Sequence, residues 1–250
     1  MNFRPDTLAG RHIKVPYHTA FYRWAADWVK GRTVIDVGCG EGYGTAILAE
    51  KARSVVGFDW DADQIEATKQ TYSRPNITYS VGNAEDTRLP SASYEVVVTN
   101  ALLEYLDDCD RFFDEAERIL KPGGVFVCST KNAIFSIKAS NGKPLYSNHN
   151  QEYSPPELEQ ALRRRFPKVE MYGLLPSERS ERFILDERAL RMEAFLVRLN
   201  VKQLIPLSWR NFIRSRLTGV PEEAIVADDF QVSRENIDRS FYVIGVGFKQ

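Results

Sequence analysis

The segment VIDVGCGEGYG, residues 34–44, places a glycine at every second position, directly after an apolar run that contains an acid. Apolar runs of this kind are typical of buried strands. Glycine permits positive φ angles and lets the backbone approach a ligand with no Cβ in the way. A helix that follows such a turn offers unpaired N–H groups to a polar part of that ligand. The segment therefore predicts a strand, a tight turn and a helix that meet at a ligand site.

Apolar runs alternate with amphipathic stretches along most of the chain. Strands are predicted at 33–38, 54–59, 76–82, 94–100, 125–130, 169–175 and 241–249, and helices at 45–52, 62–72, 107–120 and 154–166. Such alternation is typical of a parallel sheet covered by helices on both faces. Ligands bind sheets of this type beyond the carboxyl ends of the strands. We therefore expect an α/β, doubly wound fold with its site at that edge.

The alternation breaks in the second half of the chain. Helical patterns at 181–200 and 208–217 interrupt it, and they predict a helical cap inserted before the final strand. The expected organisation is an N-terminal leader helix, a ligand-binding core, the cap and a closing strand, at residues 1–31, 32–175, 176–230 and 231–250.

Composition excludes several classes of protein. The 250 residues have a formal net charge of -1, so no overall positive field favours nucleic acid. No run of about 18 apolar residues predicts a membrane span, and the first residues lack the apolar stretch of a signal peptide. The three cysteines, Cys39, Cys109 and Cys128, form an odd set without CxxC spacing. They fit a reducing compartment, so a cytoplasmic location is expected.

Several motifs, in order, resemble those of class I S-adenosylmethionine (SAM)-dependent methyltransferases over most of residues 20–175. The motif (V/I)LDxGxGxG is matched by residues 34–42, and the family's ribose-binding acid by Asp59, 19 residues after Gly40. The family's GDAE is present as GNAE at 82–85, with Asn83 in place of the usual Asp, and LKPGG at 120–124 also recurs in the family. The resemblance implies a Rossmann-like, seven-stranded sheet in the order 3-2-1-4-5-7-6, with the last strand antiparallel.

The resemblance also implies a cofactor site for SAM. The glycine turn would face the methionine end, Asp59 the ribose, and Trp60, Asn83 and Ala84 the adenine. Tyr22 of the leader helix is expected to close over the cofactor. The full set of expected cofactor residues is Tyr22, Asp36, Gly38, Cys39, Gly40, Gly42, Asp59, Trp60, Asn83, Ala84, Glu85 and Asn100.

The acceptor side is less constrained, because methyl transfer is a direct displacement that needs few catalytic groups. The N/D-P-P-Y signature of amide- and adenine-directed methyltransferases is absent. Residues 103–106 resemble a (V/I)EHL segment, with Tyr105 where histidine is usual. The segment NHNQEYSPPEL, 148–158, resembles one found in sugar- and glycan-modifying methyltransferases. It predicts O-methylation of a hydroxyl on a sugar, oligosaccharide or related natural product.

Within that segment His149 is the predicted general base, with Glu152 and Tyr105 beside it, since a neutral imidazole suits removal of a hydroxyl proton. A purely structural role for His149 and Glu152 is the alternative. A Mg²⁺ held by His149, Asp107 and Asp108 is a further possibility, but Asp108 is equally a helix N-cap, so no metal ligand is predicted. Transfer to nitrogen or carbon of a small metabolite, and a non-catalytic SAM-binding subunit, are the rival functions.

The cap has its own charge balance. From 176 to 218, nine arginines and lysines stand against five acids, and 201–217 holds four cations and no acid. Three interpretations stay open: a solvated basic face, a lid for an anionic or carbohydrate acceptor, and a surface that docks on anionic lipid or a lipid-linked acceptor. The expected partners are thus a small-molecule or glycan acceptor, with no nucleic acid.

Overall fold

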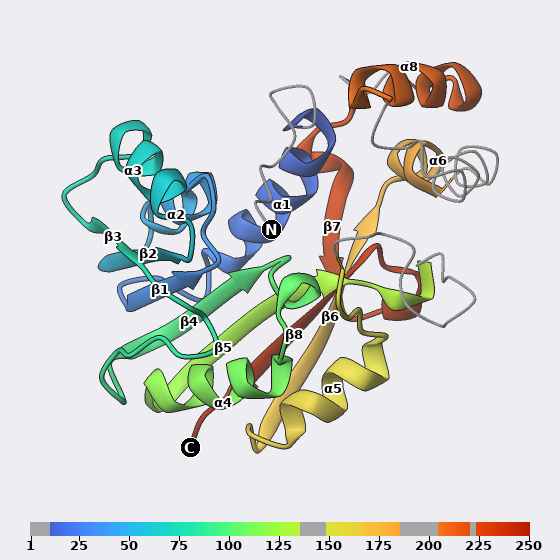
Figure 1. Cartoon of the computed structure of the whole chain (residues 1–250). Helices are drawn as coiled ribbons and strands as arrows, with labels where there is room; N and C mark the ends of the chain where they lie inside the picture. The colour runs from blue at the N-terminus through green and yellow to red at the C-terminus, as the bar shows by residue number, and fades with distance from the viewer. Residues whose placement is uncertain (1–10, 136–148, 186–204, 221–223) are drawn as a thin grey trace.

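A single mixed sheet of eight strands organises the protein (Figure 1). The computed structural model describes residues 11–135, 149–185, 205–220 and 224–250. The strands lie in the order β3-β2-β1-β4-β5-β8-β6-β7. Their bounds are β1 Thr33–Val37, β2 Ser54–Asp59, β3 Ile77–Val81, β4 Tyr94–Asn100, β5 Leu120–Lys131, β6 Lys168–Pro176, β7 Phe230–Ser233 and β8 Tyr242–Phe248.

Helices cover both faces of this sheet, as the alternating pattern predicts. The α-helices are α1 Arg11–Ala25, α2 Tyr43–Leu48, α3 Ala62–Thr71, α4 Cys109–Ile119, α5 Pro155–Arg163, α6 Glu178–Leu185 and α8 Leu207–Thr218. Short 3-10 turns are η2 Leu103–Tyr105, η3 Ala133–Phe135, η6 Ala227–Asp229 and η7 Ile237–Arg239. Phe21 of α1 and Leu48 of α2 belong to the apolar core on one face. Phe113 of α4 and Leu158 of α5 belong to the core on the other.

The local sequence explains where the helices begin. Asp61 caps α3 by accepting a hydrogen bond from the Gln64 N–H, and Asp108 caps α4 in the same way through Arg111. Ser154 and Glu157 form a capping box at the start of α5, followed by proline at the first helical positions. These caps fix each helix directly after a loop from the carboxyl end of a strand.

The predicted α/β class is confirmed, but the sheet has eight strands where seven were predicted. The seven predicted strands are present, and β8 lies between β5 and β6, antiparallel to both. An eighth strand, β7, pairs antiparallel with β6 at the sheet edge, with Gly173 opposite Ser233 and Pro176 opposite Phe230. It was missed because four residues with a half-exposed pattern carry little strand signal.

Helices α6 and α8, which come between β6 and β7 in the chain, lie beyond the carboxyl end of β6 (Figure 1). Because β5 and β6 are both antiparallel to β8, β6 runs in the same direction as β5. Helices α6 and α8 lie toward the edge of the sheet at which the parallel strands end, which is also the edge of the glycine turn (Figure 1). The predicted helix at 208–217 is confirmed as α8. Of the predicted helix at 181–200, residues 181–185 belong to α6, and the rest lies outside the described residues. Among the described residues, no helix is long and apolar enough to cross a membrane.

Candidate cofactor and acceptor site

The glycine turn links β1 to α2 and is held against the end of β2. Gly38, Gly40 and Gly42 all have positive φ, at 77°, 50° and 80°, a conformation that side chains disfavour. The Gly38 and Cys39 N–H groups both donate to the Phe58 carbonyl, at 2.7 and 3.1 Å. A Cβ added at Gly40 would meet nothing within 4 Å. The backbone at Gly40 therefore borders open space, as a ligand-facing turn requires.

Asp59, at the end of β2, lies beside that open turn. Its Oδ2 accepts a hydrogen bond from the Gly40 N–H at 2.9 Å, and its Oδ1 accepts one from Asp61 at 3.1 Å. Burial raises the pKa of the Asp59 carboxyl, although these backbone donors oppose the shift. A carboxylate has about four acceptor positions, so the Asp59 carboxylate keeps acceptor capacity for a ribose hydroxyl. The residues present thus fit the nucleoside half of SAM.

Asp36 is enclosed. Its carboxylate is fully buried and accepts hydrogen bonds from the Tyr22 hydroxyl at 3.1 Å and the Thr45 hydroxyl at 2.6 Å. Burial raises the pKa of Asp36 to about 7, against the lowering effect of these two donors. The structure therefore shows Asp36 tying β1, α1 and α2 together directly behind the glycine turn.

The fourth glycine of the motif, Gly44, is required by helix packing, whereas the first three are required by backbone conformation. Gly44 lies within α2, and a Cβ there would come within 2.2 Å of the Tyr22 ring. The absence of a side chain lets α1 pack directly on α2. His18 of α1 adds a hydrogen bond between its Nδ1 and the Tyr43 hydroxyl at 2.8 Å. Tyr22 and His18 thus attach the leader helix to the edge of the sheet where the cofactor site is predicted.

Of the residues predicted to face the adenine, Trp60 is exposed, whereas the others are buried or bonded within loops. Trp60 is 60% exposed, and Ala84 is buried. Asn83 Oδ1 accepts from the Glu85 N–H at 2.9 Å, which closes a local turn. Glu85 accepts from the N–H groups of Asp107 and Asp108, at 2.9 and 3.0 Å, and so joins the loop after β3 to the loop after β4.

Two further predicted residues are packed inside. Asn100, at the end of β4, is buried and accepts a hydrogen bond from the Ser129 hydroxyl of β5. Cys39 is buried in the turn, and burial raises the pKa of its thiol. Both lie at the carboxyl ends of strands, as expected, but the structure gives them packing contacts.

A second cluster, the acceptor-side cluster, consists of Glu104, Tyr105, Lys131, His149 and Glu152. His149 Nδ1 lies 2.6 Å from Glu152 Oε1, and the Tyr105 ring meets the His149 ring edge-on at 5.3 Å. Lys131 Nζ lies 3.5 Å from the same Glu152 oxygen. The three predicted catalytic residues are therefore adjacent, although they come from segments more than 40 residues apart.

Glu104 and Lys131 were not predicted as site residues from the sequence. Glu104 is 1% exposed, and its Oε1 accepts a hydrogen bond from the Lys131 backbone N–H at 2.6 Å. Burial raises the pKa of the Glu104 carboxyl. The only signal was that Glu104 belongs to the (V/I)EHL-like segment; Lys131, at the end of β5, carried none.

The described residues contain no group of three or more His, Cys, Asp or Glu side chains that could hold a metal ion. Asp108 Oδ1 accepts from the Arg111 N–H at 3.0 Å as the cap of α4, and Asp107 Oδ1 accepts from the Asn150 side chain at 3.2 Å. The Asp108 carboxylate is thus engaged in capping α4, and the Asp107 carboxylate in joining two loops.

Comparison with known proteins agrees with this geometry. Residues 35–128 match the methyltransferase domain family. A Mycolicibacterium smegmatis protein named "Probable S-adenosylmethionine-dependent methyltransferase" is 38% identical over 145 residues, covering 58% of this chain and 55% of the relative. A Mycobacterium tuberculosis protein with the same description is 32% identical over 163 residues, covering 65% and 58%. The chain thus spans somewhat more than half the length of the curated relatives it matches.

Solved structures share the fold at low sequence identity. A SAM-dependent methyltransferase from Thermotoga maritima aligns with a TM-score of 0.63 and 16% identity, over 96% of this chain and 93% of that one. A Haemonchus contortus phosphoethanolamine N-methyltransferase, solved with S-adenosylhomocysteine, aligns with a TM-score of 0.61 and 18% identity, over 93% and 52%. Residues 35–128 of this chain thus resemble a methyltransferase domain, and the chain shares the fold of these solved enzymes.

Proposed function

We propose that this protein transfers the methyl group of SAM to an oxygen atom of its acceptor. The observation that carries the proposal is that two groups of residues, each suited to half of the reaction, lie at the same edge of the sheet. One group is the open turn at Gly40 with the Asp59 carboxylate. The other is the His149–Glu152 pair before α5, which contacts Tyr105 after β4 and Lys131 at the end of β5. The first suits the cofactor, and the second suits removal of a proton from a hydroxyl.

When bound, SAM supplies a methyl group activated for displacement by its sulfonium. The chain's own residues have three tasks. Asp59 and the glycine turn hold the nucleoside and methionine parts. The acceptor-side cluster orients the hydroxyl toward the methyl group. His149 would take the hydroxyl proton as the acceptor oxygen bonds to the methyl carbon and the bond from that carbon to the sulfonium sulfur breaks.

Glu152 prepares His149 for this task. Its Oε1 engages Nδ1, so Nε2 is the nitrogen assigned to the acceptor's proton. The carboxylate also stabilises the imidazolium that results, and Lys131 Nζ lies 3.5 Å from the same carboxylate oxygen. Glu152 has a side chain only 2% exposed, and electrostatic interactions are stronger in such a water-poor setting.

The relatives with named acceptors support oxygen as the target. They include a fatty-acid O-methyltransferase of Mycolicibacterium smegmatis, 28% identical over 54% of this chain, and a ubiquinone biosynthesis O-methyltransferase of Chelativorans sp., 30% identical over 52%. The 148–158 segment favours a sugar or related hydroxyl as the first acceptor class to screen.

Calorimetric titration with SAM tests the cofactor half. The wild type is expected to bind, and Asp59→Ala to weaken binding by at least roughly tenfold, because hydrogen bonds to a charged group contribute about 1.5–3 kcal/mol. Asp63→Ala, at an exposed acid in the first turn of α3, is the matched control. Absence of binding by the wild type would contradict the proposal.

Turnover with an acceptor panel tests the other half. His149→Gln is expected to lower kcat by roughly a hundredfold or more, as for loss of a general base, and to leave SAM affinity unchanged. Unchanged turnover in this variant would remove His149 from the mechanism. Methylation of amines but not hydroxyls would favour the N-methyltransferase alternative.

A further inference from the structure

Helix α8 has an unusual distribution of side chains. Its exposed face carries Trp209, 66% exposed, Phe212, 59% exposed, and Ile213, 36% exposed, whereas Arg214 is only 8% exposed. Globular proteins usually show the opposite, with apolar side chains inside and arginine outside. A group of large exposed apolar side chains on one helix face marks an interaction surface.

The inner side of α8 packs against α6. The Arg214 guanidinium lies over the Phe183 ring of α6, 5.6 Å from its centre. Thr218 is buried and donates to the Arg214 carbonyl at 3.0 Å, and Gly219 ends the helix with φ of 71°. Turning the aromatic face inward would expose these contacts.

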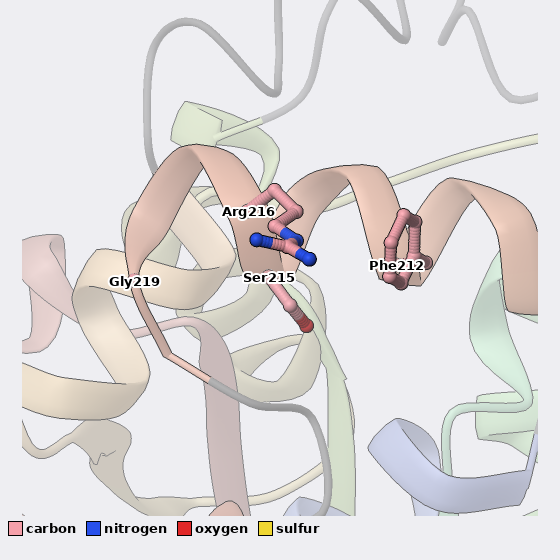
Figure 2. A pocket seen from close by; sticks show the side chains of 4 residues that line it. All are labelled: Phe212, Ser215, Arg216 and Gly219. Atoms are coloured by element: carbon pink, nitrogen blue, oxygen red, sulfur yellow. The ribbon is translucent and has the colours of Figure 1, made fainter.

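The outer face also carries positive charge. Arg216 lies over the Phe212 ring, 5.4 Å from its centre. Figure 2 shows both side chains, which line a shallow hollow with Ser215 and Gly219. Residues 205–220 contain three arginines and no acid. Figure 1 places α8 at the periphery of the molecule, beyond α6.

We propose that the Trp209–Phe212–Ile213–Arg216 face of α8 docks the protein on the surface of an anionic lipid bilayer. Tryptophan and phenylalanine insert at the boundary between headgroups and acyl chains, and arginine pairs with lipid phosphates. A second copy of the chain is a poorer occupant. A two-fold contact through this face would place Arg216 of each copy against the same apolar side chains, with no acid among the four face residues to pair with it. This proposal does not depend on methyl transfer.

Co-sedimentation with vesicles tests it, using the full chain without cofactor. The wild type is expected to bind vesicles of equal parts phosphatidylcholine and phosphatidylglycerol, to bind phosphatidylcholine alone much more weakly, and to be released by added salt. Arg216→Glu, and separately Trp209→Ser, should each weaken binding by roughly tenfold or more. Two substitutions elsewhere serve as matched controls. Trp60→Ser removes a tryptophan that is also exposed, and Lys30→Glu reverses an exposed charge before β1. Neither should change binding.

Each other outcome would overturn the proposal. These are absence of binding by wild type, equal binding to neutral vesicles, and equal loss in the controls. Concentration-dependent dimerisation that Trp209→Ser abolishes, without vesicle binding, would assign the face to a second copy. Because both α8 substitutions are at exposed positions, their thermal unfolding temperatures should match the wild type, which separates loss of docking from loss of fold.

Discussion

The Tyr22 hydroxyl of α1 donates a 3.1 Å hydrogen bond to the buried Asp36 carboxylate of β1. The same Tyr22 ring packs where a side chain on Gly44 would be. One tyrosine of the leader helix therefore contacts both the acid before the glycine turn and the helix after it. The leader is part of the framework that shapes the cofactor site.

Replacing Tyr22 with phenylalanine should destabilise the fold while keeping the ring contact with Gly44. The lost donor serves a fully buried carboxyl, so we expect a cost of about 1–3 kcal/mol in the free energy of unfolding. Urea unfolding measures it. Tyr94→Phe, at a half-buried tyrosine of β4, is the control and should cost less. Equal values for the two variants would mean that the Tyr22 hydrogen bond adds no stability.

Asp36 should make stability depend on pH. Burial raises its pKa in the folded protein to about 7 from 3.8, so the folded state holds a proton that the unfolded state releases. Stability from this group is therefore lost as pH rises from about 4 to about 7. Between pH 5.5 and 8 the wild type should lose about 2 kcal/mol relative to Asp36→Asn, from roughly 1.5 pH units at 1.36 kcal/mol each.

The measurement is a pair of urea curves at each pH for the wild type, Asp36→Asn and the exposed control Asp63→Asn. The control should follow the wild type. If the difference between wild type and Asp36→Asn stays constant over this pH range, the Asp36 carboxyl ionises at an ordinary pH in the folded protein.

Substitution of Gly44 by alanine sets two effects against each other. Helix propensity favours alanine by about 1 kcal/mol. The added Cβ, however, would lie 2.2 Å from the Tyr22 ring, and overpacking typically costs about 1–3 kcal/mol. We expect net destabilisation. In a Tyr22→Ala background the same substitution should become neutral or stabilising, which a double-mutant cycle by urea unfolding would show. A cost that persists without the Tyr22 ring would refute the steric explanation.

The sequence predicted the parts of this structure that depend on local patterns. Strands with buried β-branched runs, such as 94–100, and helices with caps, such as Asp61 before α3, follow from residues close together in the chain. The glycine turn and Asp59 followed from motif spacing. In each case the residues that form the strand, cap or turn are the same residues whose sequence pattern predicts it.

The parts that were missed depend on contacts between distant residues. The β7 strand is four residues long and gains its identity by pairing with β6. Lys131 follows an ordinary strand pattern, and its contact with Glu152 arises only when the loop before α5 folds back over β5. Asp36 was predicted from its motif, whereas the Tyr22 and Thr45 hydroxyls that enclose its carboxylate come from parts of the chain that the motif does not connect.

The Lys131–Glu152–His149 contacts allow a test that separates stability from catalysis. Glu152→Gln leaves the Lys131 ammonium, with its side chain 9% exposed, without that carboxylate. Breaking a buried ion pair in this way costs about 3–5 kcal/mol. Glu152→Gln combined with Lys131→Met should recover much of that stability, because both charges are then gone.

Turnover should not recover in the same way. Neither variant has a carboxylate on His149 Nδ1, so both should show a kcat reduced by about tenfold or more with the KM for SAM unchanged. Glu157→Gln, in the exposed capping box of α5, controls for general disturbance of this segment and should keep the wild-type kcat. A double variant that regains both stability and turnover would show that Glu152 serves only the fold, and that the acceptor's proton leaves by a route that does not use its carboxylate.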